Sequence, residues 1–259
     1  MIIRFILFAL LSTSICYETY AQFSETIVSD RPGQSNSPYT AGKMVLQFQT
    51  GPQFDGGNSG SRESNSFSMP LMVRFGIADK VDLLTLWSYK REKEKSSSME
   101  QTMNGINTAD IGLRFNIFEE TDKAPALGFE AFYKTELTSK DYKPNYPSAK
   151  LNLMTSKSIS KLLSITANLG LDVAGQGGGS NGFYTFNLVF AISEHLSLFA
   201  ENYGDFTYEN INVFFDFGGA YLIGPNLQLD LYGGFGSNDG WSSSFVSGGI
   251  SYRITSWRK

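Results

Sequence analysis

The stretch Asn212-Val-Phe-Phe-Asp-Phe-Gly-Gly-Ala-Tyr221 decides the fold of this chain. Val213, Phe215 and Phe217 are apolar, whereas Asn212 and Asp216 fill alternate positions. Side chains on a strand point alternately to its two faces. The stretch is therefore predicted to be a strand with one apolar face and one mostly polar face.

Eleven other segments repeat this alternation. With the first, they occupy residues 44–48, 67–75, 81–87, 111–117, 127–133, 151–155, 163–173, 184–192, 196–200, 212–221, 227–231 and 246–254. The predicted fold is all-β, a single closed antiparallel up-and-down transmembrane β-barrel of about 12 strands. Its apolar faces would meet lipid, and its polar faces would line a lumen.

The connections between these segments alternate between short and long. The short ones are 76–80, 119–124, 156–161, 193–195 and 224–226, and the long ones are 55–65, 90–107, 138–146, 175–182, 205–209 and 237–241. Outer-membrane barrels have short periplasmic turns and longer outside loops, and an even strand number places both termini on the periplasmic side. A soluble β-sandwich, which buries its apolar faces, is the alternative.

The first 21 residues resemble a secretion signal. Arg4 precedes the apolar segment Phe5–Ile15, and the small residue Ala21 predicts cleavage before Gln22. A lipoprotein anchor at Cys16 is the alternative, although Ile15 stands where such sites have a small residue.

Three regions follow from this pattern: a signal peptide over 1–21, an extended N-terminal arm over 22–42 and an outer-membrane β-barrel over 43–256. The expected location is the outer membrane of a Gram-negative bacterium.

Composition excludes several classes of protein. Cys16 is the only cysteine, so the mature chain has neither disulfides nor cysteine-rich metal sites. The net charge of -4 provides no basic surface for nucleic acid. The longest purely apolar run found after the signal is 188–192, too short for a helix that spans a membrane. Any membrane span must therefore consist of strands in a closed barrel.

Charged residues recur on the polar phases of the predicted strands, and these are the candidate lumen-lining residues. They are Arg74, Asp82, Asp110, Arg114, Glu130, Lys134, Glu136, Lys150, Asp172, Glu201, Asp216, Asp230 and Arg253. Unpaired burial would be costly, so they are expected to face water or one another. Two interpretations remain: a self-paired lumen that maintains the shape of the barrel, or a pore that weakly favours cations.

No catalytic residue, metal site or cofactor site is predicted. The single histidine, His195, falls in a predicted periplasmic turn, which is the wrong end for an outer-rim hydrolase. The charged tract Lys90–Lys95 is predicted to be a mobile outside loop. Gly175–Gly179 is read as a flexible loop because no helix follows it.

Several segments resemble a known family. They are the arm 29–38, with Asp30, Arg31, Pro32, Gln34, Ser37 and Pro38, and the stretches 74–83, 110–115, 222–230 and 248–253. They are similar to a family of outer-membrane transporters named for an association with the meta pathway of phenol degradation. The resemblance implies an outer-membrane barrel and a transport role, but no particular solute.

The expected function is a passive channel or transporter for small solutes, hydrophobic or aromatic ones among them. The alternatives are a structural or adhesive barrel without transport, and a soluble periplasmic ligand-binding β-sheet protein. Expected partners are outer-membrane lipid, an unidentified solute and the barrel-assembly machinery, although Trp257 is followed by two basic residues where such barrels commonly end on an aromatic one.

We hypothesise that the arm folds into the lumen and narrows it. Asp30 and Arg31 would fold back against the lumen wall and pair with residues of opposite charge, such as Arg114 and Asp216. Deletion of residues 23–40 would then raise the conductance.

Overall fold

The computed structural model describes residues 24–174, 179–238 and 240–257. The predicted signal peptide, with its cleavage site and Cys16, lies outside these residues, so its cleavage stays a prediction.

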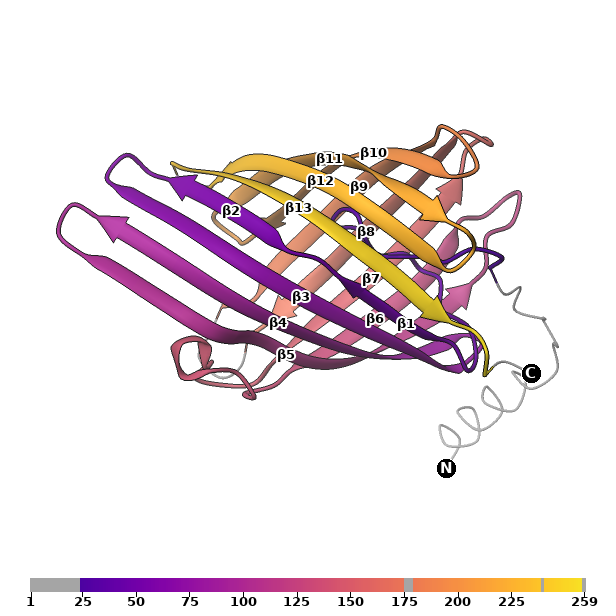
Figure 1. Cartoon of the computed structure of the whole chain (residues 1–259), viewed down its shortest axis with the longest axis horizontal. Coiled ribbons are helices and arrows are strands. Elements are labelled where there is room, and N and C mark those ends of the chain that lie inside the picture. The colour runs from indigo at the N-terminus through magenta and orange to yellow at the C-terminus, as the bar shows by residue number, and fades with distance from the viewer. Residues whose placement is uncertain (1–23, 175–178, 239, 258–259) are drawn as a thin grey trace, which may run out of the picture.

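Thirteen strands form one antiparallel sheet (Figure 1). They are β1 (Leu46–Thr50), β2 (Gln53–Asn58), β3 (Arg62–Ala78), β4 (Val81–Ser96), β5 (Glu100–Phe118), β6 (Ala126–Lys134), β7 (Ser148–Ser158), β8 (Leu163–Val173), β9 (Asn181–Ala191), β10 (Leu196–Phe206), β11 (Ile211–Ile223), β12 (Leu227–Asn238) and β13 (Trp241–Ile254). The sheet closes because β1 and β2 each pair with both β13 and β3.

The predicted closed barrel of twelve strands is confirmed, with one strand more than expected. The extra strand arises because Gly51 and Pro52 interrupt the first position, so β1 and β2 share one place in the ring. Met44, predicted in the first strand, precedes it and has a φ of 59°.

Alternation along each strand separates the outside of the barrel from its inside. On β11, Phe217 is 58% exposed whereas Asp216 is 1% exposed. On β4, Leu84 is buried while Trp87 is exposed. The apolar side chains therefore form the outer surface, as predicted.

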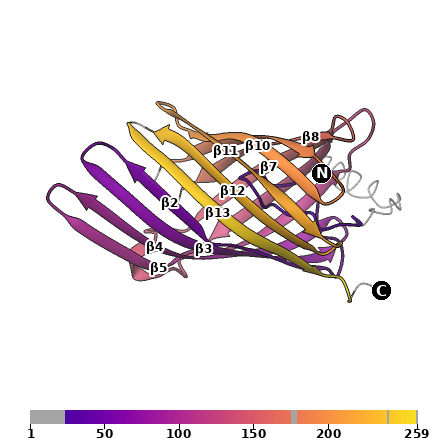
Figure 2. The same cartoon turned by 45° about the horizontal axis from the view of Figure 1, so that its top comes forward.

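The β2–β3 and β4–β5 hairpins extend beyond the rest of the wall at one end (Figures 1 and 2). The prediction of a mobile loop at Lys90–Lys95 is wrong, because these residues continue β4. Their charges alternate faces and find partners: Lys90 pairs with Glu92 at 2.8 Å, and Lys93 with Glu100 at 2.7 Å. Most of the predicted long connection 90–107 is therefore paired strand.

The opposite end of the barrel carries the two described terminal segments. Arg253 donates from its guanidinium to the backbone oxygens of Ser24 and Glu25. The short turns lie at this end too, as the bond from Ile27 N to Pro225 O shows.

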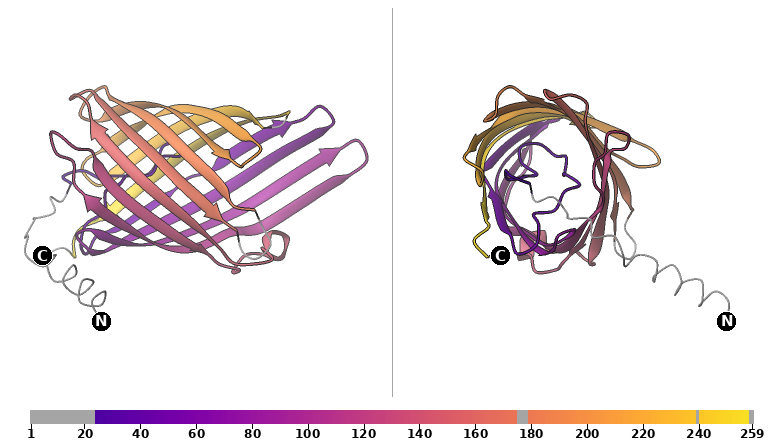
Figure 3. Two further views of the ribbon diagram at one scale, coloured as in Figure 1. Left: turned by 180° about the vertical axis from the view of Figure 1, so that it is seen from behind. Right: turned by 90° about the vertical axis from the view of Figure 1, so that its right-hand side faces the viewer.

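The arm, residues 24–45, contains no helix or strand. It winds through the interior of the ring, which the end-on view in Figure 3 shows. Within residues 24–174, 179–238 and 240–257, the one helical element is the short 3-10 turn η1 (Lys140–Tyr142), between β6 and β7. Among the described residues, no helix is long and apolar enough to cross a membrane.

Candidate functional site

Most of the predicted lumen residues meet around the arm. Eight are nearly inaccessible to solvent, with at most 8% exposure: Arg74, Asp82, Arg114, Glu130, Glu201, Asp216, Asp230 and Arg253. Another four are half-buried, on β5 to β8: Asp110, Lys134, Lys150 and Asp172. Glu136 does not belong to the lumen set, since it lies exposed in the loop after β6 and pairs with Lys143 at 3.7 Å.

Asp30 is the main anchor of the arm. Its two carboxylate oxygens accept from the guanidinium of Arg114 at 2.9 Å each, and Arg74 approaches at 3.4 Å. Two parallel bonds of this kind combine strength with fixed geometry. Burial alone raises the pKa of the Asp30 carboxyl, but the charges of Arg114 and Arg74 outweigh it and the pKa lies below its ordinary value. The carboxyl is therefore held as an anion.

The same two arginines also bind acids of the wall. Arg74 pairs with Asp82 at 2.9 Å, and Nε of Arg114 donates to Glu130 at 2.9 Å. Asp30 thus completes a network of buried charges that come from four strands, β3 to β6, and the arm. Removing one member of such a network leaves an uncompensated buried charge.

Arg31 is fixed on the other side of the barrel. Its guanidinium donates to Asp230 on β12 at 2.9 and 3.2 Å and to Ser247 on β13 at 3.0 Å. The predicted pairing of Arg31 with Asp216 is wrong. Asp216 on β11 stands opposite Glu201 on β10, and Arg31 pairs instead with Asp230 on the next strand, β12.

The middle of the arm is held mainly by polar groups. The backbone N–H of Gln34 donates to Glu201 at 2.6 Å, and Ser35 bonds the same carboxylate. Gly33 has a φ of 101°, and a Cβ there would lie 2.8 Å from an oxygen of Glu201. Glycine therefore suits both the backbone conformation and the close approach.

The rest of the arm motif is also tied to the wall or to itself. Ser37 N–H donates to Asp30 at 3.1 Å, and Asn116 donates to the carbonyl of Pro38 at 3.2 Å. Pro32 follows Arg31, whose carbonyl accepts from Gln228 at 2.7 Å.

Two kinds of interior side chain were not among the residues predicted from the sequence. Uncharged partners of the arm include Asn36, whose N–H donates to Asn168 at 2.7 Å. Aromatic rings on inward phases include Tyr203 and Phe214, which stack with centroids 5.3 Å apart. Both kinds could have been found from the sequence, because their amides and aromatic rings occupy inward-facing positions of the predicted strands.

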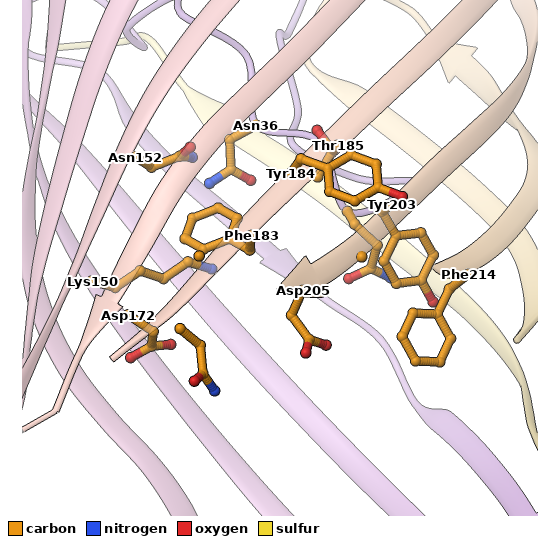
Figure 4. A pocket seen from close by; sticks show the side chains of 14 residues that line it. Asn36, Lys150, Asn152, Asp172, Phe183, Tyr184, Thr185, Tyr203, Asp205 and Phe214 are labelled. Atoms are coloured by element: carbon orange, nitrogen blue, oxygen red, sulfur yellow. The ribbon is translucent and has the colours of Figure 1, made fainter. Parts of the chain in front are cut away.

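A cavity of about 350 Å³ lies inside the barrel against the arm (Figure 4). Its lining combines arm residues Gln34 and Asn36 with wall residues that include Lys150, Phe183 and Tyr203. Lys134 and Asp172, which pair at 2.6 Å, belong to the same region of the wall.

His195 is not among the residues that line this cavity. His195 lies in the turn between β9 and β10, where its ring stacks on Tyr221 at 6.1 Å. Within the described ranges, no group of three or more His, Cys, Asp or Glu side chains could hold a metal ion.

Comparison with known proteins gives one family and many similar folds. The family model described as "Putative MetA-pathway of phenol degradation" matches residues 29–254. The resemblance read from the sequence is thereby confirmed. Comparison with the curated proteins gives no match.

Three solved structures illustrate the similarity of fold. An outer-membrane channel from Pseudomonas putida F1 has a TM-score of 0.59 at 8% identity, over 88% of this chain and 100% of that one. The translocator domain of the autotransporter NalP from Neisseria meningitidis has a TM-score of 0.58 at 12% identity, over 87% and 90%. The Pseudomonas putida toluene transporter TodX has a TM-score of 0.51 at 11% identity, over 89% and 97%. None of the three is described as an enzyme, and at these identities the likeness concerns the fold.

Proposed function

We propose that this chain, which belongs to the family described as "Putative MetA-pathway of phenol degradation", is a passive outer-membrane channel for small solutes. The observation that carries the proposal is the division of the barrel wall. Apolar side chains such as Leu231, 65% exposed, cover the outside, and polar and charged groups line the inside. This is the arrangement of a barrel that spans lipid and encloses water.

The arm sets the width of the pathway in this proposal. It occupies the lumen and is held there by Asp30 and Arg31, which bind opposite parts of the wall. Solute would pass beside the arm, so the arm restricts the size of what can enter. The lumen-lining set then has two roles: most of its members anchor the arm, and the half-buried group near Lys150 faces the remaining space.

Outer-membrane lipid as the surrounding medium, export behind a cleaved signal and insertion by the barrel-assembly machinery belong to the same proposal. The polar lumen favours a transport role.

Flux of a solute panel into liposomes that contain the purified mature chain tests the proposal. Expected is uptake of small solutes that liposomes without protein exclude. A variant lacking residues 24–40 should conduct more than the full chain in planar bilayers. Unchanged conductance would refute the restricting arm, and absence of flux from both proteins would favour a structural or adhesive barrel.

A further inference from the structure

The cavity beside the arm has two facing sides of different chemistry. Figure 4 shows Lys150 and Phe183 on one side, and Tyr203 and Phe214 on the other. Asn36 of the arm also lines the cavity. Its volume of about 350 Å³ falls within the usual range for small-molecule pockets.

Aromatic rings form much of the apolar lining. Tyr203 and Phe214 stack at an interplanar angle of 20°, so their two rings lie nearly parallel. Phe183 presents its face to Lys150, whose ammonium nitrogen lies 4.5 Å from the ring centroid. A planar ring that enters between these sides would meet aromatic partners from two directions.

Lys150 supplies a cation that is not used elsewhere in the described part of the chain. Its ammonium makes no ion pair or hydrogen bond with any residue of these ranges, and its nitrogen lies over the ring of Phe183. Three acids, Glu130, Asp172 and Asp110, act on it electrostatically, and two of these are engaged by other cations. Both oxygens of Asp172 accept from Lys134 at 2.6 Å, and Glu130 binds Arg114. The donors of Lys150 are therefore free for a solute.

Asp205 gives the site a direction. It is the other acid of the lining, and it accepts from Asn212 at 2.7 Å. A negatively charged group on a solute would be repelled by Asp205 and attracted by Lys150. The charged end of an anionic solute should thus lie at Lys150, with its ring toward Tyr203 and Phe214.

We infer that this cavity binds a monocyclic aromatic carboxylate. Its ring lies between the aromatic sides, and its carboxylate accepts charge-assisted hydrogen bonds from Lys150. An uncharged hydrocarbon of the same size would leave the ammonium without a partner while removing it from water, which disfavours binding. The inference rests on the proposed function, because the solute reaches the cavity through the lumen, and it adds the class of solute.

Calorimetric titration of the full chain in detergent with benzoate tests the inference. Benzyl alcohol keeps the ring without the charge, and cyclohexanecarboxylate keeps the charge without the aromatic ring. Benzoate should bind at least about tenfold more tightly than benzyl alcohol, the effect of one charge-assisted bond. It should bind about two- to tenfold more tightly than cyclohexanecarboxylate, the effect of one stacked ring.

Substitutions at both sides of the cavity make the test specific. Lys150→Met should weaken benzoate binding about tenfold or more, and Lys150→Arg should retain most of it. Phe214→Leu should weaken benzoate and leave cyclohexanecarboxylate nearly unchanged. Lys157→Met is the matched control, since Lys157 lies on the same strand β7 but pairs with Glu120, outside the cavity lining.

The outcomes separate this inference from the proposed function. Equal affinity of the parent and Lys150→Met for benzoate, or equal affinity of benzoate and benzyl alcohol, would overturn the inference even if solutes cross the barrel. If benzoate binds as expected but no solute crosses liposomes, the channel proposal fails and the binding site stands. Heat-modifiable migration on gels verifies that each variant is folded.

Discussion

Arg114 on β5 binds both carboxylate oxygens of Asp30 at 2.9 Å, although 84 residues separate the two in sequence. Arg114 is completely buried, and it also binds Glu130 on the neighbouring strand. The pair joins a segment without regular structure to the wall of a closed barrel. An arm fixed in this way is part of the folded interior and not a loose terminal segment.

Asp30→Asn should loosen the arm. The substitution removes a buried negative charge that Arg114 and Arg74 share, and losing one partner of such a network costs about 3 kcal/mol. The arm should then leave the lumen part of the time, which would appear in planar bilayers as higher mean conductance with added fluctuations. Glu25→Gln is the control, because Glu25 is exposed and contacts the wall through its backbone oxygen. Identical traces for both variants would contradict the anchoring role.

Gly249→Ala should displace Arg31 from Asp230. A Cβ at position 249 would lie 2.4 Å from Nε of Arg31, which is already bound to Asp230 and Ser247 and has little freedom to move. Combining it with Arg31→Ala removes the clash, so the double variant should be about as stable as Arg31→Ala alone. Urea unfolding of the four proteins should give a coupling energy of about 1 kcal/mol or more. Simple additivity of the two losses would argue against this contact.

Cysteines at positions 29 and 251 should form a disulfide. The Oγ atoms of Ser29 and Ser251 lie 2.7 Å apart, and a disulfide requires sulfur atoms about 2.05 Å apart. The one cysteine of the natural chain is Cys16, inside the predicted signal peptide. The chain after cleavage therefore contributes no other thiol to the alkylation. Oxidation should protect both thiols of Ser29→Cys/Ser251→Cys from alkylation, as measured by mass. Persistent alkylation of both would place the arm elsewhere, and each single substitution serves as a control.

Leu231→Arg should be destabilising in a bilayer. Leu231 is 65% exposed in the middle of the outward apolar residues of β12, and arginine at the midplane of a membrane barrel costs about 2–4 kcal/mol. On a surface facing water, the same change would fall within about 0.5 kcal/mol of zero. Unfolding in lipid vesicles measures the difference. Ser242→Arg, near the end of an adjacent strand, should cost about 0–1 kcal/mol, so equal effects at both positions would be inconsistent with a lipid-facing wall.

The sequence alone determined the architecture of the barrel wall. The alternation in stretches such as 212–221 set which side chains face out, and the number of such stretches set the number of positions in the ring. Both properties follow from the two-residue period of a strand, which is a local property of the backbone. The pairing of Asp30 with Arg114 could also be proposed, because buried charges require partners.

Tertiary structure decided what the local period leaves open. Arg31 binds Asp230 and not Asp216 because the path of the arm across the lumen brings it beside β12. Most of residues 90–107 became strand because β3, β4 and β5 pair beyond the rest of the wall, where alternating charges find cross-strand and same-face partners. The cavity at Lys150 exists only where five strands, β7 to β11, and the arm meet. Side chains so far apart in sequence become neighbours through register and closure, which no local pattern encodes.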